Sequence, residues 1–200
     1  MKNKIGLLAI LALTLFSAKS FAFGAAGLLL EPMVTYQTGE QHVHNPAPFN
    51  DSNDSSKGVG LGLRAGVHLL DIVFVALDGR YSRPNYHSDA LGGNAFADQS
   101  NLGVTAGVQT PILGIRLWGT YIFTGELDPA EINNVNVRFH DFDGYRVGAG
   151  LYVSVVSLNV EYQDGHYRKT DGQNGMGYST SNIQSHDQSV IFSVSAPLVF

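Results

Sequence analysis

Apolar and polar residues alternate with a period of two along much of this chain, most clearly near its C-terminal end. The even positions from 190 to 200 are apolar: Val190, Phe192, Val194, Ala196, Leu198 and Phe200. Ser193 and Ser195 lie on the other face. A period of two is typical of a β-strand whose faces meet different environments. The segment therefore predicts a strand with an apolar outer face and a polar inner face, as in a transmembrane barrel.

The same alternation recurs in eight segments of roughly ten residues, the length that a tilted strand needs to cross a bilayer. We place these segments near 28–38, 58–69, 72–82, 99–109, 114–124, 143–153, 157–167 and 188–200. Short links near 70–71, 110–113 and 154–156 alternate with long polar segments at 39–57, 83–98, 125–142 and 168–187. The pattern predicts an all-β protein: an eight-stranded antiparallel up-and-down transmembrane β-barrel with short periplasmic turns and four long extracellular loops.

Inward positions collect charged residues that are expected to form a network in the lumen. They are Glu31, Arg64, Asp78, Arg80, Arg116, Arg146 and Glu161. If the second turn centres near Asp71, Arg64 and Asp78 lie opposite one another on neighbouring strands. Eight strands enclose an interior that side chains can fill, so pairing across the lumen would plug the barrel. A selective pore or gate is the alternative.

Outward aromatic residues cluster toward the loop ends of the strands and predict an aromatic girdle at the membrane interface. The predicted girdle residues are Tyr36, Tyr81, Tyr121, Phe123, Tyr145 and Tyr162, with Phe200 in the opposite, periplasmic girdle. Many inward positions are glycine, for example Gly60, Gly62 and Gly148, which suits a narrow, tightly curved barrel.

Two prolines fit the strand pattern less well. Pro32 and Pro197 each remove a backbone donor inside a predicted strand. Because they fall in the first and last strands, we expect them at the closure seam. The alternative is that the first strand begins after Pro32.

The N-terminal segment has the features of a secretory signal peptide. A basic start with Lys2 and Lys4 precedes an apolar run from Ile5 to Phe16, and Ser20-Phe21-Ala22 approximates a cleavage site. The run is shorter than the roughly 20 residues of a transmembrane helix. We expect residues 1–22 to be a signal peptide and residues 23–200 to be one outer-membrane β-barrel domain, located in the outer membrane of a Gram-negative cell.

Composition limits the chemistry that this chain can perform. The formal net charge is -5 and arginines are dispersed, so no basic patch for nucleic acid is expected. The absence of cysteine excludes disulfides and thiol chemistry. His42 and His44 could bind zinc or copper with further loop ligands. Acids near the third loop, namely Glu126, Asp128, Glu131, Asp141 and Asp143, could bind calcium, although solvated loop charge is favoured. No metal site and no cofactor are predicted.

A lipid A-modifying barrel enzyme is a further alternative. A deacylase would need Ser, His and a carboxylate together on the lipid-facing wall. His166, Ser185, His186, Asp187 and Ser189 supply the residue types, but the His-x-Ser motif of lipid A deacylases is missing. We therefore predict no catalytic residues and no enzyme activity.

The strand count, loop asymmetry, girdle and terminal Phe200 together resemble the small bacterial outer-membrane β-barrels typified by the OmpA transmembrane domain and OmpX. That resemblance implies a monomeric membrane scaffold that displays polar surface loops, in surface interaction, adhesion or envelope integrity. It implies contact with the lipid bilayer and lipopolysaccharide, a possible extracellular ligand of the loops, and recognition of Phe200 by the barrel assembly machinery. A conduit for small hydrophobic molecules, as in OmpW-like barrels, would require an apolar lumen.

Overall fold

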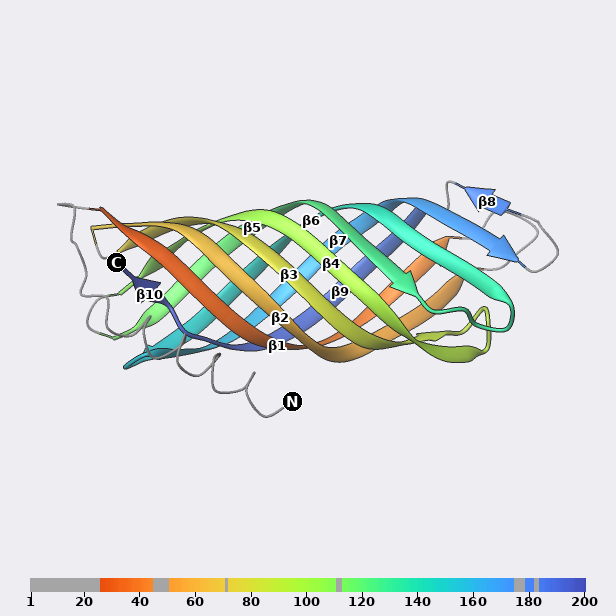
Figure 1. Ribbon diagram of the computed structural model, residues 1–200, viewed down its shortest axis with the longest axis horizontal. Coiled ribbons are helices and arrows are strands. Elements are labelled where there is room, and N and C mark those ends of the chain that lie inside the picture. Colours follow the sequence, from red (N-terminus) through yellow and green to blue (C-terminus); the bar gives the residue numbers. More distant parts are fainter. Residues whose placement is uncertain (1–25, 45–50, 71, 111–112, 175–178, 182–183) are drawn as a thin grey trace, which may run out of the picture.

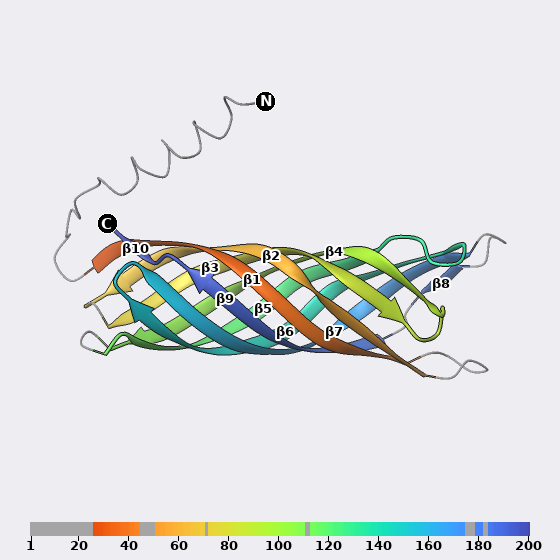
Figure 2. The same cartoon turned by 90° about the horizontal axis from the view of Figure 1, so that it is seen from below.

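Long antiparallel strands wind around a common axis and close into a barrel (Figures 1 and 2). The computed structural model describes residues 26–44, 51–70, 72–110, 113–174, 179–181 and 184–200. The strands are β1 (Ala26–His44), β2 (Ser52–Leu69), β3 (Val73–Ser88), β4 (Gly93–Gln109), β5 (Ile115–Pro129), β6 (Val135–Val153), β7 (Val156–Asn174), β8 (Ser179–Ser181), β9 (Gln184–Ser195) and β10 (Leu198–Val199). The expected signal peptide, residues 1–22, lies outside the described residues and stays a prediction.

Eight of the described strands, β1 to β7 and β9, form the closed ring, and each pairs with its neighbours in the antiparallel sense. The ring closes where β1 pairs with β9, from Met33 opposite Ser195 to His44 opposite Gln184. β8 extends the sheet beside β7, and β10 pairs with the start of β1. The predicted all-β, eight-stranded up-and-down fold is therefore confirmed.

The strands are longer than the sequence analysis expected. They contain 15 to 19 residues from β1 to β7, whereas about ten suffice to cross the hydrocarbon. Much of the segments 39–57, 83–98, 125–142 and 168–187, expected as loops, is strand. Backbone pairing simply continues beyond the membrane, because inward apolar residues such as Val43, Tyr86 and Phe139 pack on one another there.

The outward face divides each strand into a membrane-spanning part and an outer extension. On β1, Leu28, Val34 and Tyr36 are exposed, and the outward positions that follow include Glu40 and His42. β3, β6 and β7 show the same change from apolar to polar residues beyond Tyr81, Tyr145 and Tyr162. An apolar band about 25 Å tall with aromatic borders is the outer surface that lipid requires. No helix among the described residues is long and apolar enough to span a membrane.

The closure seam accommodates both prolines. β1 runs through Pro32, so the alternative that the first strand begins after this residue is wrong. Pairing with the last strand is interrupted between β9 and β10, where Ala196 N donates to Pro32 O at 3.0 Å. Beyond the gap, Leu28 and Phe200 exchange backbone hydrogen bonds of 2.9 and 3.0 Å. The seam thus loses ladder bonds only where proline lacks the donor.

Candidate functional site in the barrel interior

The seven charged residues expected in the lumen lie together in one group of hydrogen bonds and ion pairs, here called the charge layer, in which Arg64 lies 3.7 Å from Glu31. All seven are 8% exposed or less. Glu161 accepts from Arg64 and Arg80, each at 2.6 Å, and Asp78 accepts from Arg64 at 2.7 Å. Arg116 binds both oxygens of Glu31 at 2.7 and 2.8 Å, while Arg146 reaches Asp78 at 3.2 Å. The layer joins six strands across the interior.

Strand register creates this layer. Arg64 and Asp78 are direct partners across β2 and β3, and Glu31 is the partner of Arg64 on β1. Arg80 follows Asp78 by two residues and so points to the same side. Charge-assisted and bidentate bonds of this kind are strong and geometrically specific. Unpaired charges buried in the barrel interior would cost free energy, and this arrangement pairs most of them.

Aromatic rings pack against the charge layer on its side nearer the barrel end where the C-terminus lies. The Arg64 guanidinium lies 4.6 Å from the Trp118 ring centre, and the Arg116 guanidinium lies 5.0 Å from that of Phe74. Trp118 Nε1 also donates to Glu161 at 2.7 Å. Glycine makes this possible, because a Cβ on Gly148 would lie 2.3 Å from Trp118 Cε2. The inward glycine therefore provides space for the indole.

Toward the outer end, a polar belt and then an apolar cluster follow the charge layer. Gln37 donates to Gln99, and Ser82 donates to Gln99 at 3.1 Å. The outer apolar cluster comprises Val43, Tyr86, Ala97, Ile122, Leu127, Ile132, Phe139, Phe142 and Tyr167. The sequence analysis missed this cluster because it assigned most of these positions to loops. Its expectation of a charged lumen therefore describes only part of the interior.

Local irregularities turn these apolar residues inward. The register between β4 and β5 shifts at Leu102/Gly103, which leaves Phe123 as an extra residue on β5. On β6, Asp141 adopts a φ of 59°, and the flanking Phe139 and Phe142 are both buried. Bulges change which residues face inward along a strand. The strict alternation of the membrane-spanning part, continued along each strand, does not predict which residues face inward in the outer extension.

Two carboxylates lie buried in the outer extension without an arginine bonded to them. Asp187 is 2% exposed and accepts from Gln163 Nε2 at 3.2 Å. Burial raises the pKa of Asp187 to about 6, and the Gln163 bond offsets this only in part. Asp54 is 4% exposed, and burial also raises the pKa of its carboxyl above the ordinary value.

We expect Asp187→Asn to stabilise the barrel at neutral pH. The folded pKa of about 6 lies above the ordinary value of 3.8, so the folded state binds the proton more tightly and loses stability as pH rises between these values. Removing the charge should raise the free energy of unfolding by about 2–3 kcal/mol above pH 7 and by little at pH 4. Urea unfolding at several pH values measures this difference.

Asp164→Asn is the matched control for that variant. Although burial opposes ionisation of Asp164, hydrogen bonds from Gln188 and His186 lower the pKa of its carboxyl. Its replacement should therefore destabilise the protein at neutral pH. A benefit of Asp187→Asn that does not change with pH would show that the buried charge is not its cause.

The residue types considered for a lipid A deacylase lie on opposite faces of the wall. Ser185, Asp187 and Ser189 are buried on the inner side, whereas His166 is exposed and His186 is half-buried on the outer side. His166 and His186 stack with ring centres 4.3 Å apart. A serine–histidine–carboxylate arrangement cannot form from this set, because adjacent strand residues point to opposite faces.

His42, His44, His87 and His140 lie on the outer surface together with the acids, whereas His68 is buried inside the barrel. His42 is the register partner of His186, and His44 contacts Asp51 at 3.0 Å. Within the described ranges, no group of three or more metal-ligating residues has a suitable arrangement. The acids near residues 126–143 meet basic partners: Arg138 pairs with Glu126, Arg168 with Asp143 at 2.9 Å, and Lys169 with Asp141 at 2.5 Å.

The predicted girdle residues point outward at the border of the apolar band. Tyr36, Tyr81, Tyr121, Phe123, Tyr145 and Tyr162 are 38–56% exposed. Tyr121 donates to Asp143 at 2.8 Å, Tyr162 donates to Asp164 at 3.3 Å, and Tyr81 donates to Asp98. Phe200 lies at the opposite end of the barrel, beside Leu28. The aromatic rings lie on the membrane side and the carboxylates lie on the water side, which is the arrangement expected at a membrane–water interface.

Comparison with known proteins agrees with this architecture. Residues 8–186 match the family described as outer membrane protein beta-barrel domain. The chain belongs to this family. As a member of the outer membrane protein beta-barrel domain family, it lies in the outer membrane of a Gram-negative cell, with lipid around its apolar band. No curated protein sequence matches it.

Solved structures of outer-membrane barrels are similar to this family member in fold. Neisserial surface protein A is 13% identical, covering 86% of this chain and 99% of its own, with a TM-score of 0.46. OprG from Pseudomonas aeruginosa is 10% identical, covering 88% and 96%, with a TM-score of 0.46. The protease OmpT from Escherichia coli is 8% identical, covering 93% and 100%, with a TM-score of 0.43.

Proposed function

We propose that this barrel is a closed membrane scaffold that presents its outer extension at the cell surface, in surface interaction, adhesion or envelope integrity. The observation that carries the proposal is the charge layer, in which seven buried side chains from six strands bond across the lumen. The outer apolar cluster lies above it as a second obstruction. An ion entering from either end would have to break the charge-assisted bonds of this layer.

The partners of the scaffold follow from its surface chemistry. Lys57 and Arg83 point outward just beyond the apolar band, where cations meet the phosphates of lipopolysaccharide. Phe200, at the end of the last strand, is proposed as the signal for the barrel assembly machinery. We propose a monomer, because the described ring of strands is closed on itself and leaves no long edge for a second copy.

Conductance in a planar bilayer tests the closed state. We expect the refolded protein to show the heat-dependent gel migration of a folded barrel and negligible single-channel current. The pore alternative predicts a steady current that changes in Arg64→Ala or Arg116→Ala. An ion-selective current in the wild-type protein would overturn the scaffold proposal.

The surface role needs its own test. Replacing the outer loop 130–134 by a short turn should abolish binding to cells or matrix and leave gel migration unchanged, because barrel stability resides in backbone pairing. Replacing the turn at 154–155, at the other end of the barrel, is the control. Binding that persists without the outer loop would contradict a role for this rim.

A further inference from the structure

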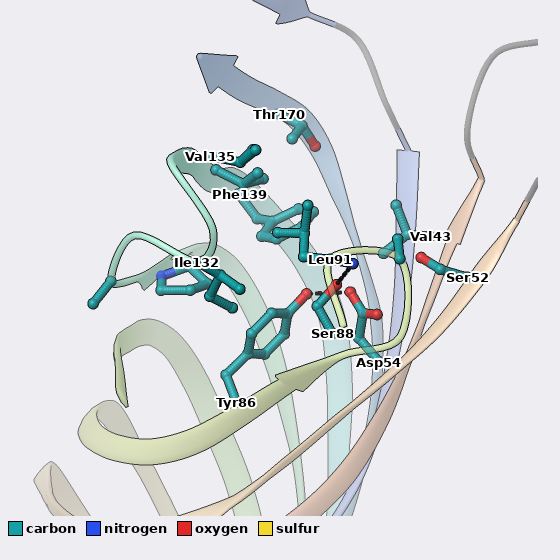
Figure 3. Close-up of a pocket in the computed structure, with 14 residues that line it drawn as sticks. Val43, Ser52, Asp54, Tyr86, Ser88, Leu91, Ile132, Val135, Phe139 and Thr170 are labelled. Carbon is teal, nitrogen blue, oxygen red and sulfur yellow. Dashed lines mark hydrogen bonds between the residues drawn. The ribbon is translucent and has the colours of Figure 1, made fainter. Parts of the chain in front are cut away.

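A small cavity opens at the outer end of the barrel interior, lined in part by the outer apolar cluster (Figure 3). Its volume is about 90 Å³. Most of the wall is apolar and includes Val43, Leu91, Ile132, Val137 and Phe139. The loops that follow β3 and β5 close over it, and they are tied together where Asn133 Nδ2 donates to Leu91 O at 2.7 Å. The cavity is therefore a formed site.

One carboxylate supplies the polar end of this cavity. Figure 3 shows Asp54 and Tyr86 pointing toward one another, and the Tyr86 hydroxyl donates to Asp54. The other Asp54 oxygen accepts from Asp89 N at 3.0 Å. These donors are neutral, and no lysine, arginine or histidine in the described ranges forms an ion pair with Asp54. A carboxylate that is 4% exposed thus lacks a counter-charge.

The surroundings of Asp54 reinforce the need for a cation. Gln41 is its register partner on β1, and Asp187 on β9 is the register partner of Gln41 on the other side. All three side chains are buried, and Gln41 Oε1 has no hydrogen-bond partner in the part of the chain that the structure describes. Two buried carboxylates and an unpaired carbonyl oxygen form a row of acceptors below the cavity. Such acceptors are costly unless a donor or cation reaches them.

The charge layer does not meet this need. Its four arginines are bonded mainly to Glu31, Asp78 and Glu161, among which Asp78 and Glu161 each contact more than one arginine. In the outer extension the basic residues Lys57, Arg138 and Lys169 are exposed on the outer face. The described residues therefore supply no cation to Asp54, and its ionised form would be stabilised by a cation that binds in the cavity.

We propose that the outer cavity binds a small organic cation, a protonated primary amine on a short apolar body, with its ammonium group on Asp54 and its body against Ile132 and Phe139. The size fits a compact body, because an apolar cavity of about 150 Å³ holds benzene and this cavity is smaller. An anion would be repelled by Asp54, and a sugar would leave hydroxyls unpaired against the apolar wall. This site goes beyond the scaffold role and does not depend on whether the lumen conducts.

Burial raises the pKa of Asp54, despite the bonds from Tyr86 and Asp89 that favour its ionised form. An ammonium group beside the carboxylate would reverse this effect, because an opposite charge favours the ionised form. Amine binding should accordingly weaken as pH falls and Asp54 takes up a proton. Of the groups near Asp54, Tyr86 and Ser88 are neutral in this range, and the charge of Asp89 raises the pKa of Asp54 further.

Calorimetric titration of the refolded full barrel in micelles at pH 8 tests the proposal, with isobutylamine and propylamine as cationic probes. Isobutanol and isovalerate are the neutral and anionic counterparts of isobutylamine. We expect a saturable amine signal with a dissociation constant on the order of 1 mM. Asp54→Asn should weaken amine binding at least tenfold, whereas Asp98→Asn should leave it unchanged. Asp98→Asn removes the same charge from the outer face, and Asp98 does not line the cavity.

A second variant tests the cavity without altering the acid. Ile132→Phe adds bulk to the wall from a loop position, so it should block the amine and leave heat-dependent gel migration unchanged. Equal amine binding in the wild type and Asp54→Asn would overturn the proposal, as would isovalerate binding as tightly as isobutylamine. Absence of binding of either amine at about 10 mM would also overturn it.

Discussion

Asp78→Ala is expected to lower the free energy of unfolding by about 3–5 kcal/mol, the cost of removing one partner from a buried ion pair. Asp78 is fully buried and accepts from Arg64 at 2.7 Å, from Arg80 at 2.8 Å and from Arg146 at 3.2 Å. Its removal leaves three guanidinium groups with Glu161, with the longer ion pair from Arg64 to Glu31, and with neutral acceptors. Urea unfolding in micelles measures the loss, and Trp118 reports directly on the layer because its indole donates to Glu161.

Asp98→Ala is the matched control. Asp98 is exposed on the outer face, where it accepts from Tyr81, so its loss should cost less than about 1 kcal/mol. The double variant Asp78→Ala/Arg146→Met removes one cation together with the anion. If the charge imbalance causes the loss, this variant should be more stable than Asp78→Ala alone. Strictly additive effects of the two substitutions would argue that the charges in the layer do not interact.

The membrane-spanning part of the barrel is predictable from sequence because each strand has one face toward lipid and the other toward the narrow interior. Lipid selects apolar outward residues such as Leu61 and Leu117, and the narrow interior selects glycine or paired charge at the positions between them. The short turn at Ser154–Val155 fixes the register of β6 and β7, and the link near Leu70 does the same for β2 and β3. The alternation of inward and outward residues and the position of the turn together therefore place Arg64 opposite Asp78.

The outer extension is harder to predict because its outward face meets water. Tyr86 and Phe139 are each flanked by polar residues, and nothing in their immediate sequence distinguishes a strand with a polar outer face from a loop. The bulge at Phe123 and the positive φ of Asp141 also break the alternation. The cavity beside Asp54 depends on contacts between two loops and several strands far apart in the chain, which spacing along the sequence does not encode.

In the closed state proposed above, the charge layer and the outer apolar cluster both obstruct the lumen. The charge layer depends on directional bonds among Arg64, Arg116 and their acids, whereas the outer apolar cluster depends on shape and burial. Loss of one acid disturbs several bonds at once, because Glu161 accepts from three side chains. Loss of one ring leaves a void whose walls relax only in part. The two obstructions lie in series, so either can be weakened separately.

Phe142→Ala is expected to lower the free energy of unfolding by about 3–5 kcal/mol, the usual cost of deleting a buried aromatic ring. Phe142 is 1% exposed, and its ring centre lies 4.7 Å from that of Tyr167. The ring also lies over Gly165, where an added Cβ would approach Phe142 Cζ to 2.5 Å. Urea unfolding followed by gel migration measures the loss. Phe123→Ala deletes the same ring from the outer face, where it is 45% exposed, and should cost far less.

Bilayer recordings of Phe142→Ala separate the two obstructions. Removing the ring opens space in the outer apolar cluster and leaves the bonds of the charge layer intact, so the variant should remain without current although it is less stable. Current through Phe142→Ala would mean that the charge layer passes ions and that the aromatic cluster alone closes the barrel. Equal stability losses in Phe142→Ala and Phe123→Ala would instead show that the outer interior is loosely packed, and closure would then rest on the charge layer.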